Sequence, residues 1–95
     1  MVVRMATSSV WLNVNEKDLV PALHDAADKL DSADGEMMLD FSSVRRIDSN
    51  AVRAMEELAR KADEKAVKLV LRGVNVDVYK VLKLVNLAPR LSFAG

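Results

Sequence analysis

The residue types that most often perform catalysis are few in this 95-residue sequence. There is no cysteine, which excludes a thiolate nucleophile, a cysteine-ligated metal and thioredoxin-type redox chemistry. The three glycines, at positions 35, 73 and 95, are too far apart for a dinucleotide-binding fingerprint, and the Gly-Lys-Ser/Thr of a phosphate-binding loop is absent. A Ser-His-Asp triad would have to use His24, the only histidine. Because His24 stands beside the apolar face of a predicted helix, far from any strand end, we expect an exposed helical side chain.

Asp40 stands at the end of an apolar run and invites comparison with a phospho-accepting aspartate. That chemistry also needs a neighbouring acidic pair that holds Mg²⁺ and a lysine that contacts the phosphoryl group. The first predicted strand ends instead in Asn13, Val14 and Asn15. The sequence therefore predicts no catalytic residue, no metal and no cofactor, and a protein that is not an enzyme.

The segment Ile47, Asp48, Ser49, Asn50 has two interpretations. Aspartate, serine and asparagine all cap helices well, so Ser49 could simply accept a hydrogen bond from the first turn, worth about 1 kcal/mol. Alternatively, Ser49 is a regulatory phosphorylation site. A phosphoserine adds roughly −1.5 to −2 charge, which a helix N-terminus tolerates and which would alter any partner docked over it.

Apolar runs and helical periodicity predict the elements that position these residues. Leu19, Leu23 and Leu30 recur on one helical face, and Met55 and Leu58 belong to a second amphipathic stripe. We expect helices over 16–31, 49–64 and 76–86, strands near 10–14, 37–41 and 67–72, and shorter strands at 2–3 and 91–93. Ser42 and Ser43 are expected in a polar loop. Gly35 is expected to have a left-handed backbone conformation where the chain leaves the first helix, and Asn86 to be a left-handed cap of the third helix.

Strands that alternate with helices predict an α/β fold, with a largely parallel sheet flanked by helices in one domain over residues 1–95. The runs 37–39 and 69–71 are continuously apolar, as in strands covered on both faces. The expected core is Trp11 or Leu12, Leu23, Leu30, Met38 or Leu39, Met55, Leu58, Leu69, Leu71, Val81 and Leu82.

Composition limits the partners. The chain has 14 basic and 14 acidic residues and no net charge, so the basic surface typical of nucleic-acid binders is not expected. The opening residues lack the apolar run of a secretion signal, and no run of about 18 apolar residues occurs. We therefore expect a cytoplasmic protein without direct membrane insertion, either a monomer or a weak homodimer, since a net charge of zero removes one barrier to self-association.

Three segments together resemble the STAS domain family, whose members include bacterial anti-sigma factor antagonists. They are 39–44 (LDFSSV), 47–49 (IDS) and 69–74 (LVLRGV), and the similarity covers about residues 36–90. The resemblance implies a partly parallel, mixed sheet and a phosphoacceptor at Ser49. It also implies a partner, an anti-sigma factor kinase, that the unphosphorylated form would bind, releasing a sigma factor.

The closing stretch also resembles the STAS subunit of lipid-asymmetry ABC transporters. The similarity runs through Gly73, Val74, Asn75, Val78, Tyr79, Lys83, Leu84, Asn86 and Leu87. It implies an alternative partner, the transporter ATPase. Both alternatives share a fold and a binding surface.

Helix N-termini in parallel α/β folds gather at the carboxyl edge of the sheet, where ligands usually dock. The partner surface is accordingly expected around the two loops and the first turns of the second helix. Its predicted residues are Ser42, Ser43, Asp48, Asn50, Arg53 and Glu57.

Overall fold

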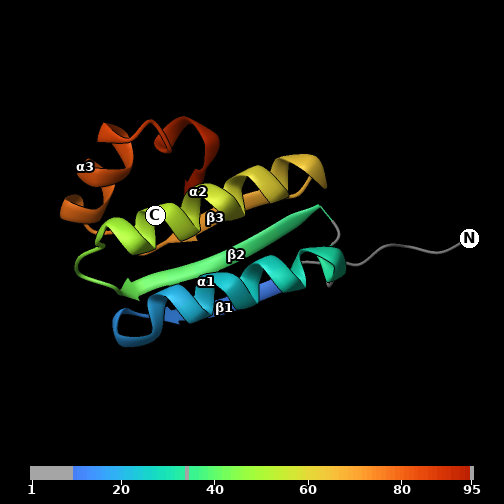
Figure 1. The fold of residues 1–95 in the computed structure, drawn as a ribbon, viewed down its shortest axis with the longest axis horizontal. Coiled ribbons are helices and arrows are strands. Elements are labelled where there is room, and N and C mark those ends of the chain that lie inside the picture. The colour runs from blue at the N-terminus through green and yellow to red at the C-terminus, as the bar shows by residue number, and fades with distance from the viewer. Residues whose placement is uncertain (1–9, 34, 95) are drawn as a thin grey trace, which may run out of the picture.

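A computed structural model describes residues 10–33 and 35–94 (Figure 1). The strands are β1 (Val10–Asn15), β2 (Glu36–Ser43), β3 (Lys68–Arg72) and β4 (Ser92–Ala94). The helices are α1 (Leu19–Asp28), α2 (Ser49–Glu64) and α3 (Val76–Leu84), with the 3-10 turns η2 (Glu16–Asp18), η3 (Lys29–Ser32) and η4 (Ala88–Arg90). The α/β fold with three main helices is therefore confirmed.

The sheet has the order β1-β2-β3-β4, and all three strand pairs are parallel. The antiparallel part of the expected mixed sheet is thus not among the described strands, and the predicted strand at Val2 and Val3 lies outside the described residues. The predicted short strand at 91–93 is confirmed as β4, one residue later than expected.

The predicted helices are confirmed with small changes at their ends. The first is an α-helix between two 3-10 turns, and Pro21 lies in its first turn, where its missing N–H costs nothing. The third helix ends at Leu84, and Asn86 has the expected positive φ of 62°. Gly35 also has a positive φ, 96°, as predicted.

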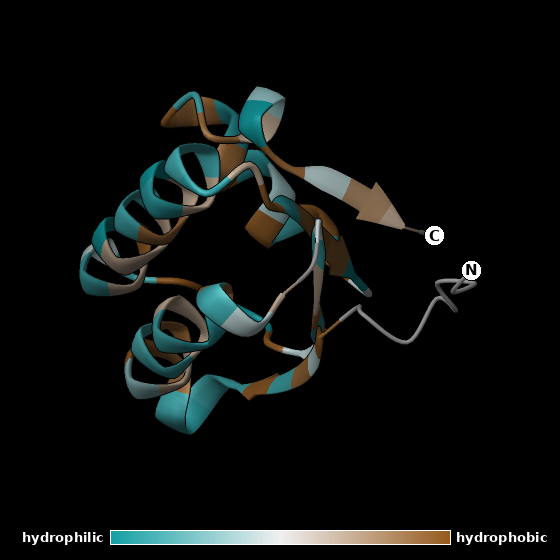
Figure 2. Cartoon of the chain, turned by 90° about the vertical axis from the view of Figure 1, so that its right-hand side faces the viewer, coloured by the Kyte–Doolittle hydropathy of each residue, from teal (hydrophilic) through white to brown (hydrophobic). Residues whose placement is uncertain are grey.

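Helices α1 and α2 pack side by side on one face of the sheet (Figures 1 and 2). The side chains that face them form rows across paired strands, such as Leu12, Leu39 and Leu71, of which Leu39 and Leu71 are fully buried. α3 adds Val78 and Leu82 to the same core. A single hydrophobic cluster therefore joins all three helices to the sheet.

The expectation of strands covered on both faces is wrong for β2. Its burial alternates, with Met37, Leu39 and Phe41 buried and Met38 only half-buried. On the opposite face Trp11 is 48% exposed, and the guanidinium carbon of Arg72 lies 5.5 Å from its ring centroid. Trp11 is therefore not a core residue, and Val81 is half-buried rather than buried. β3 fits the expectation, because Leu69, Val70 and Leu71 are all buried. In β2 the side chains alternate between the two faces, and only those that face the helices are fully buried.

Candidate functional site

The carboxyl ends of β1, β2 and β3 lie at one edge of the sheet, because the strands are parallel. The chain leaves β1 into α1 there, and β2 into a loop over 44–48 that leads to α2. This edge therefore brings together the starts of both helices, which is the location predicted from the sequence.

Asp48, not Ser49, caps α2. Its backbone is extended, and its Oδ1 accepts a hydrogen bond of 2.9 Å from the Ala51 N–H. Ser49 is the first helical residue, is exposed, and its hydroxyl forms no hydrogen bond within the described residues. Of the two interpretations of Ser49, capping is thus wrong, because the neighbouring carboxylate already performs it; phosphorylation stays a prediction.

The loop before α2 is held by two side chains distant in sequence. The Oε1 of Glu16 accepts from the N–H groups of Arg45, at 2.7 Å, and Arg46, at 3.3 Å. From the other side, the Asn75 amide donates to the carbonyl oxygens of Val44, at 3.4 Å, and Arg45, at 3.1 Å. The position of Ser49 therefore depends on residues of η2 and of the turn before α3.

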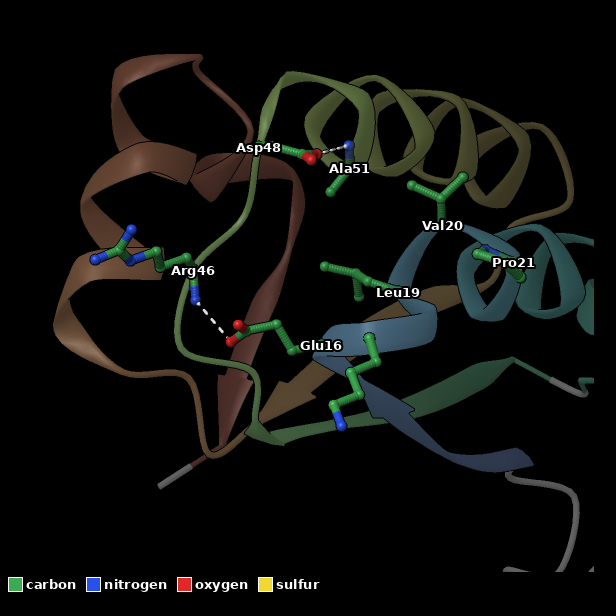
Figure 3. Close-up of a pocket in the computed structure, with 8 residues that line it drawn as sticks. Glu16, Leu19, Val20, Pro21, Arg46, Asp48 and Ala51 are labelled. Atoms are coloured by element: carbon green, nitrogen blue, oxygen red, sulfur yellow. Dashed lines mark hydrogen bonds between the residues drawn. The ribbon is translucent and has the colours of Figure 1, made fainter.

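A hollow of about 390 Å³ opens at this edge, between the start of α1 and the start of α2 (Figure 3). Its apolar surface comes from Leu19, Val20 and Ala51, while Glu16 and Asp48 bring carboxylates. The Arg46 side chain, attached at its rim, points away from the hollow (Figure 3). The remaining lining residues are Lys17 and Pro21.

A second hollow, of about 340 Å³, lies between α1 and α2. Three predicted partner residues, Asn50, Arg53 and Glu57, line it from α2, because their spacing places them on one helical face. Val20 and His24 line it from α1. His24 is exposed, as expected. These residues lie together with Asp48 and Ser49, so most of the predicted surface is contiguous.

Ser42 and Ser43 are placed differently from the prediction. They belong to β2 rather than to a loop, because β1 pairs with β2 as far as Ser43 and the Ser43 hydroxyl donates to the Val14 carbonyl at 3.0 Å. The loop over 44–48 separates them from Ser49. They lie at the same sheet edge, but within the described residues no hydrogen bond connects them to the start of α2.

The Asp40 carboxylate is bound by Ser42. Its Oδ1 accepts from the Ser42 hydroxyl at 2.5 Å and from the Ser42 N–H at 2.9 Å. These hydrogen bonds, helped by the charge of Arg72, hold the pKa of Asp40 below its ordinary value of 3.8. Asp40 is therefore an anion that orders the end of β2.

Among the described residues, charged and polar side chains, rather than a grouped set of metal-ligating residues, occupy this edge. In the part of the chain that the structure describes, no three histidine or acidic side chains are grouped as a metal site would need. No described helix is both long and apolar enough to cross a membrane. What the edge presents is an exposed serine at the start of α2, whose two sequence neighbours, Asp48 and Asn50, each line one of the two hollows.

Sequence reasoning missed Glu16, Lys17 and Val20 as parts of this site. Glu16 acts on Arg45, 29 residues away, and no local pattern announces such a contact. The predicted fold could have indicated this contact, since a parallel sheet places the residues after β1 beside those after β2.

Known proteins resemble this chain in family and in structure. A family model described as "Mlab, STAS domain" matches residues 16–91. No curated protein matches the chain. The crystal structure of a candidate anti-sigma factor antagonist of Thermotoga maritima, TM1081, is similar with a TM-score of 0.73 and 19% identity, over 95% of this chain and 81% of that one. An NMR structure of TM1081 is similar with a TM-score of 0.75 and 20% identity, over 96% of this chain and 77% of that one.

Proposed function

The chain belongs to the STAS domain family, and on that premise we propose that it is a non-catalytic, cytoplasmic regulatory module that works as an anti-sigma factor antagonist does. In this proposal the start of α2 binds a protein partner, an anti-sigma factor with kinase activity. Phosphorylation of Ser49 by that partner ends the complex.

The observation that carries the proposal is that Asp48, and not Ser49, caps α2. Asp48 caps the helix, and the exposed Ser49 hydroxyl has no hydrogen bond to lose among the residues that the structure describes. A kinase could therefore modify Ser49 without removing a contact that the fold needs.

The surroundings of Ser49 explain how a phosphate would act. At the first position of a 16-residue helix it is favoured by the helix dipole, so the domain stays folded. Arg53 lies one turn further along α2, exposed and without an ion pair within the described residues. It can meet a partner carboxylate in one state and the phosphate in the other, which makes the two states compete.

The test uses the full chain and a candidate kinase, sought first among the products of the genes beside this one. Ser49→Ala should abolish labelling and keep the complex, whereas Ser49→Asp should weaken the complex. Ser42→Ala, at the neighbouring exposed serine, is the matched control and should be labelled like the wild type. Labelling of Ser42 or Ser43 with Ser49 unlabelled would overturn the proposal.

A second candidate is an accessory subunit of a lipid-transport ABC transporter that binds the transporter ATPase. The closing stretch supports it, because Asn75 caps α3 and also holds the loop before Ser49. One partner could therefore contact both the start of α3 and the start of α2. A transporter ATPase gene in place of a kinase gene beside this one, and co-purification of the two products, would favour this candidate over the first.

A further inference from the structure

Exposed hydrophobic side chains are concentrated around α3. In the described part of the chain, every large exposed hydrophobic residue except Trp11 belongs to α3, follows it directly or packs against it. They are Val76, Tyr79, Leu84, Val85 and Phe93, of which Val76 is 67% and Leu84 82% exposed. Gathered apolar side chains at a surface mark interaction sites far more often than isolated ones do.

α3 is apolar on two sides. Val78 and Leu82 are fully buried in the core, as the inner stripe of a helix should be. A second stripe faces solvent with spacings of three and four residues, which place its members on one face. We call it the α3 stripe, and it consists of Val76, Tyr79, Lys80, Lys83 and Leu84.

The stripe is flanked by two hollows. One, of about 330 Å³, lies between the start of α3 and β4 and includes Tyr79 and Phe93, whose rings meet edge to face with centroids 5.2 Å apart. The other, of about 410 Å³, is lined by Lys80, Lys83 and Leu84 near the other end of the helix. The two lie along a helix of nine residues, roughly 13 Å long.

We propose that the α3 stripe binds an amphipathic helix of a protein partner, with acidic residues beside its apolar face. Two apolar side chains two turns apart on such a helix are separated by about 10 Å, which fits two hollows at opposite ends of α3. Lys80 and Lys83 are exposed and form no ion pair within the described residues, so the complementary charge on the partner is negative.

A partner helix fits better than a lipid surface or a second copy of the chain. Membrane-surface helices carry several cations and a broad apolar face, whereas α3 has two lysines and also Asp77. A second copy would place Lys80 and Lys83 of two α3 stripes against each other, because a two-fold interface brings the same patch together.

The experiment is an NMR titration of the full chain with two designed helical peptides of roughly four turns. Both have leucines at i, i+3, i+7 and i+10. One has glutamates on the flanks and the other has lysines. We expect the glutamate peptide alone to bind, with resonance shifts confined to α3 and β4.

Charge reversal provides the decisive comparison. The double variant Lys80→Glu/Lys83→Glu should lower the affinity for the glutamate peptide at least about tenfold and should bind the lysine peptide. Lys61→Glu/Lys68→Glu has the same change of charge away from α3 and should leave the preference unchanged. Ser49→Asp should also leave it unchanged, which separates this inference from the proposed function.

Several results would overturn the inference. These are no binding, equal binding of both peptides, or resonance shifts centred on α2. Binding of the wild type to anionic phosphatidylglycerol vesicles with Leu84 inserted would assign the α3 stripe to lipid instead. A concentration-dependent dimer that Leu84→Ser abolishes would assign it to a second copy.

Discussion

Asp48 and Ser49 are neighbours with different surroundings, since Asp48 caps α2 and Ser49 is exposed. Asp48→Ala should lower the free energy of unfolding by about 1 kcal/mol, because the Ala51 N–H loses its acceptor. Ser49→Ala should leave the free energy unchanged within about 0.5 kcal/mol. Urea unfolding of the two variants measures the contrast, and equal losses would mean that Ser49 shares the capping.

Arg53 should affect partner binding and not the fold. Its side chain is exposed, lines the hollow between α1 and α2, and forms no ion pair within the described residues. Arg53→Glu should weaken partner binding most strongly at low salt, because charges at a rim act mainly on association. Affinities at low and moderate salt test this, with Arg60→Glu on the same helix as control. Equal affinities for Arg53→Glu and wild type would place the interface elsewhere.

The bond between Ser42 and Asp40 makes a pH-dependent contribution to stability. Since the folded pKa of Asp40 lies below 3.8, this contribution is complete above pH 3.8 and is lost as the pH falls through the folded pKa. Ser42→Ala should raise the pKa of Asp40. The stability difference between wild type and variant should then shrink in acid. A carbon-13 NMR titration of the carboxyl group measures the shift, and an unchanged pKa in the variant would mean that Ser42 is not what lowers it.

At the scale of elements, Gly73 fixes how closely the turn after β3 approaches the end of β2. Its φ is +72°, and a Cβ there would lie 2.8 Å from the Ser42 Cβ and 3.0 Å from the Ser42 Cα. Gly35 is a matched control, because its φ is also positive but a Cβ would meet nothing within 4 Å. Gly35→Ala should cost about 1–2 kcal/mol from backbone strain alone, and Gly73→Ala clearly more. Chemical unfolding of both variants compares them, and equal costs would refute the steric argument.

The sequence predicts most elements of this fold, because helical spacing in α2 and short apolar runs in β1 and β3 are strong local signals. It predicts burial less well at Met38 and Val81. The apolar run at 37–39 does not reveal that α1 and α2 pack on the same face of the sheet, which leaves Met38 half-buried. That choice depends on tertiary packing rather than on any local pattern.

In the candidate site, too, local features could be predicted from the sequence and long-range contacts could not. Ser49 was placed correctly at the start of α2, since capping residue types before an amphipathic run are a local signal. Which of Asp48 and Ser49 caps the helix could not be decided, because both types are good caps. Glu16 and Asn75, which hold the loop between them, act over 29 to 31 residues through side-chain geometry.

At the scale of the whole molecule, one hydrophobic cluster includes residues of all three helices and of β1, β2 and β3. Unfolding should therefore be a single cooperative transition. Trp11, the only tryptophan, reports on β1, while far-ultraviolet circular dichroism reports mainly on the helices. Their urea midpoints should coincide, and an earlier transition of Trp11 fluorescence would show that β1 separates from the rest.

The order β1-β2-β3-β4 means that the strands lie in space as they follow in the chain. Val10 pairs with Met37, and Met37 with Leu69, so each strand finds its neighbour across one helical connection. During synthesis the chain leaves the ribosome from its N-terminus. Each emerging strand then meets the free edge formed by the one before it. The sheet can grow by addition at one side, and no described strand has to be inserted between two that have already paired.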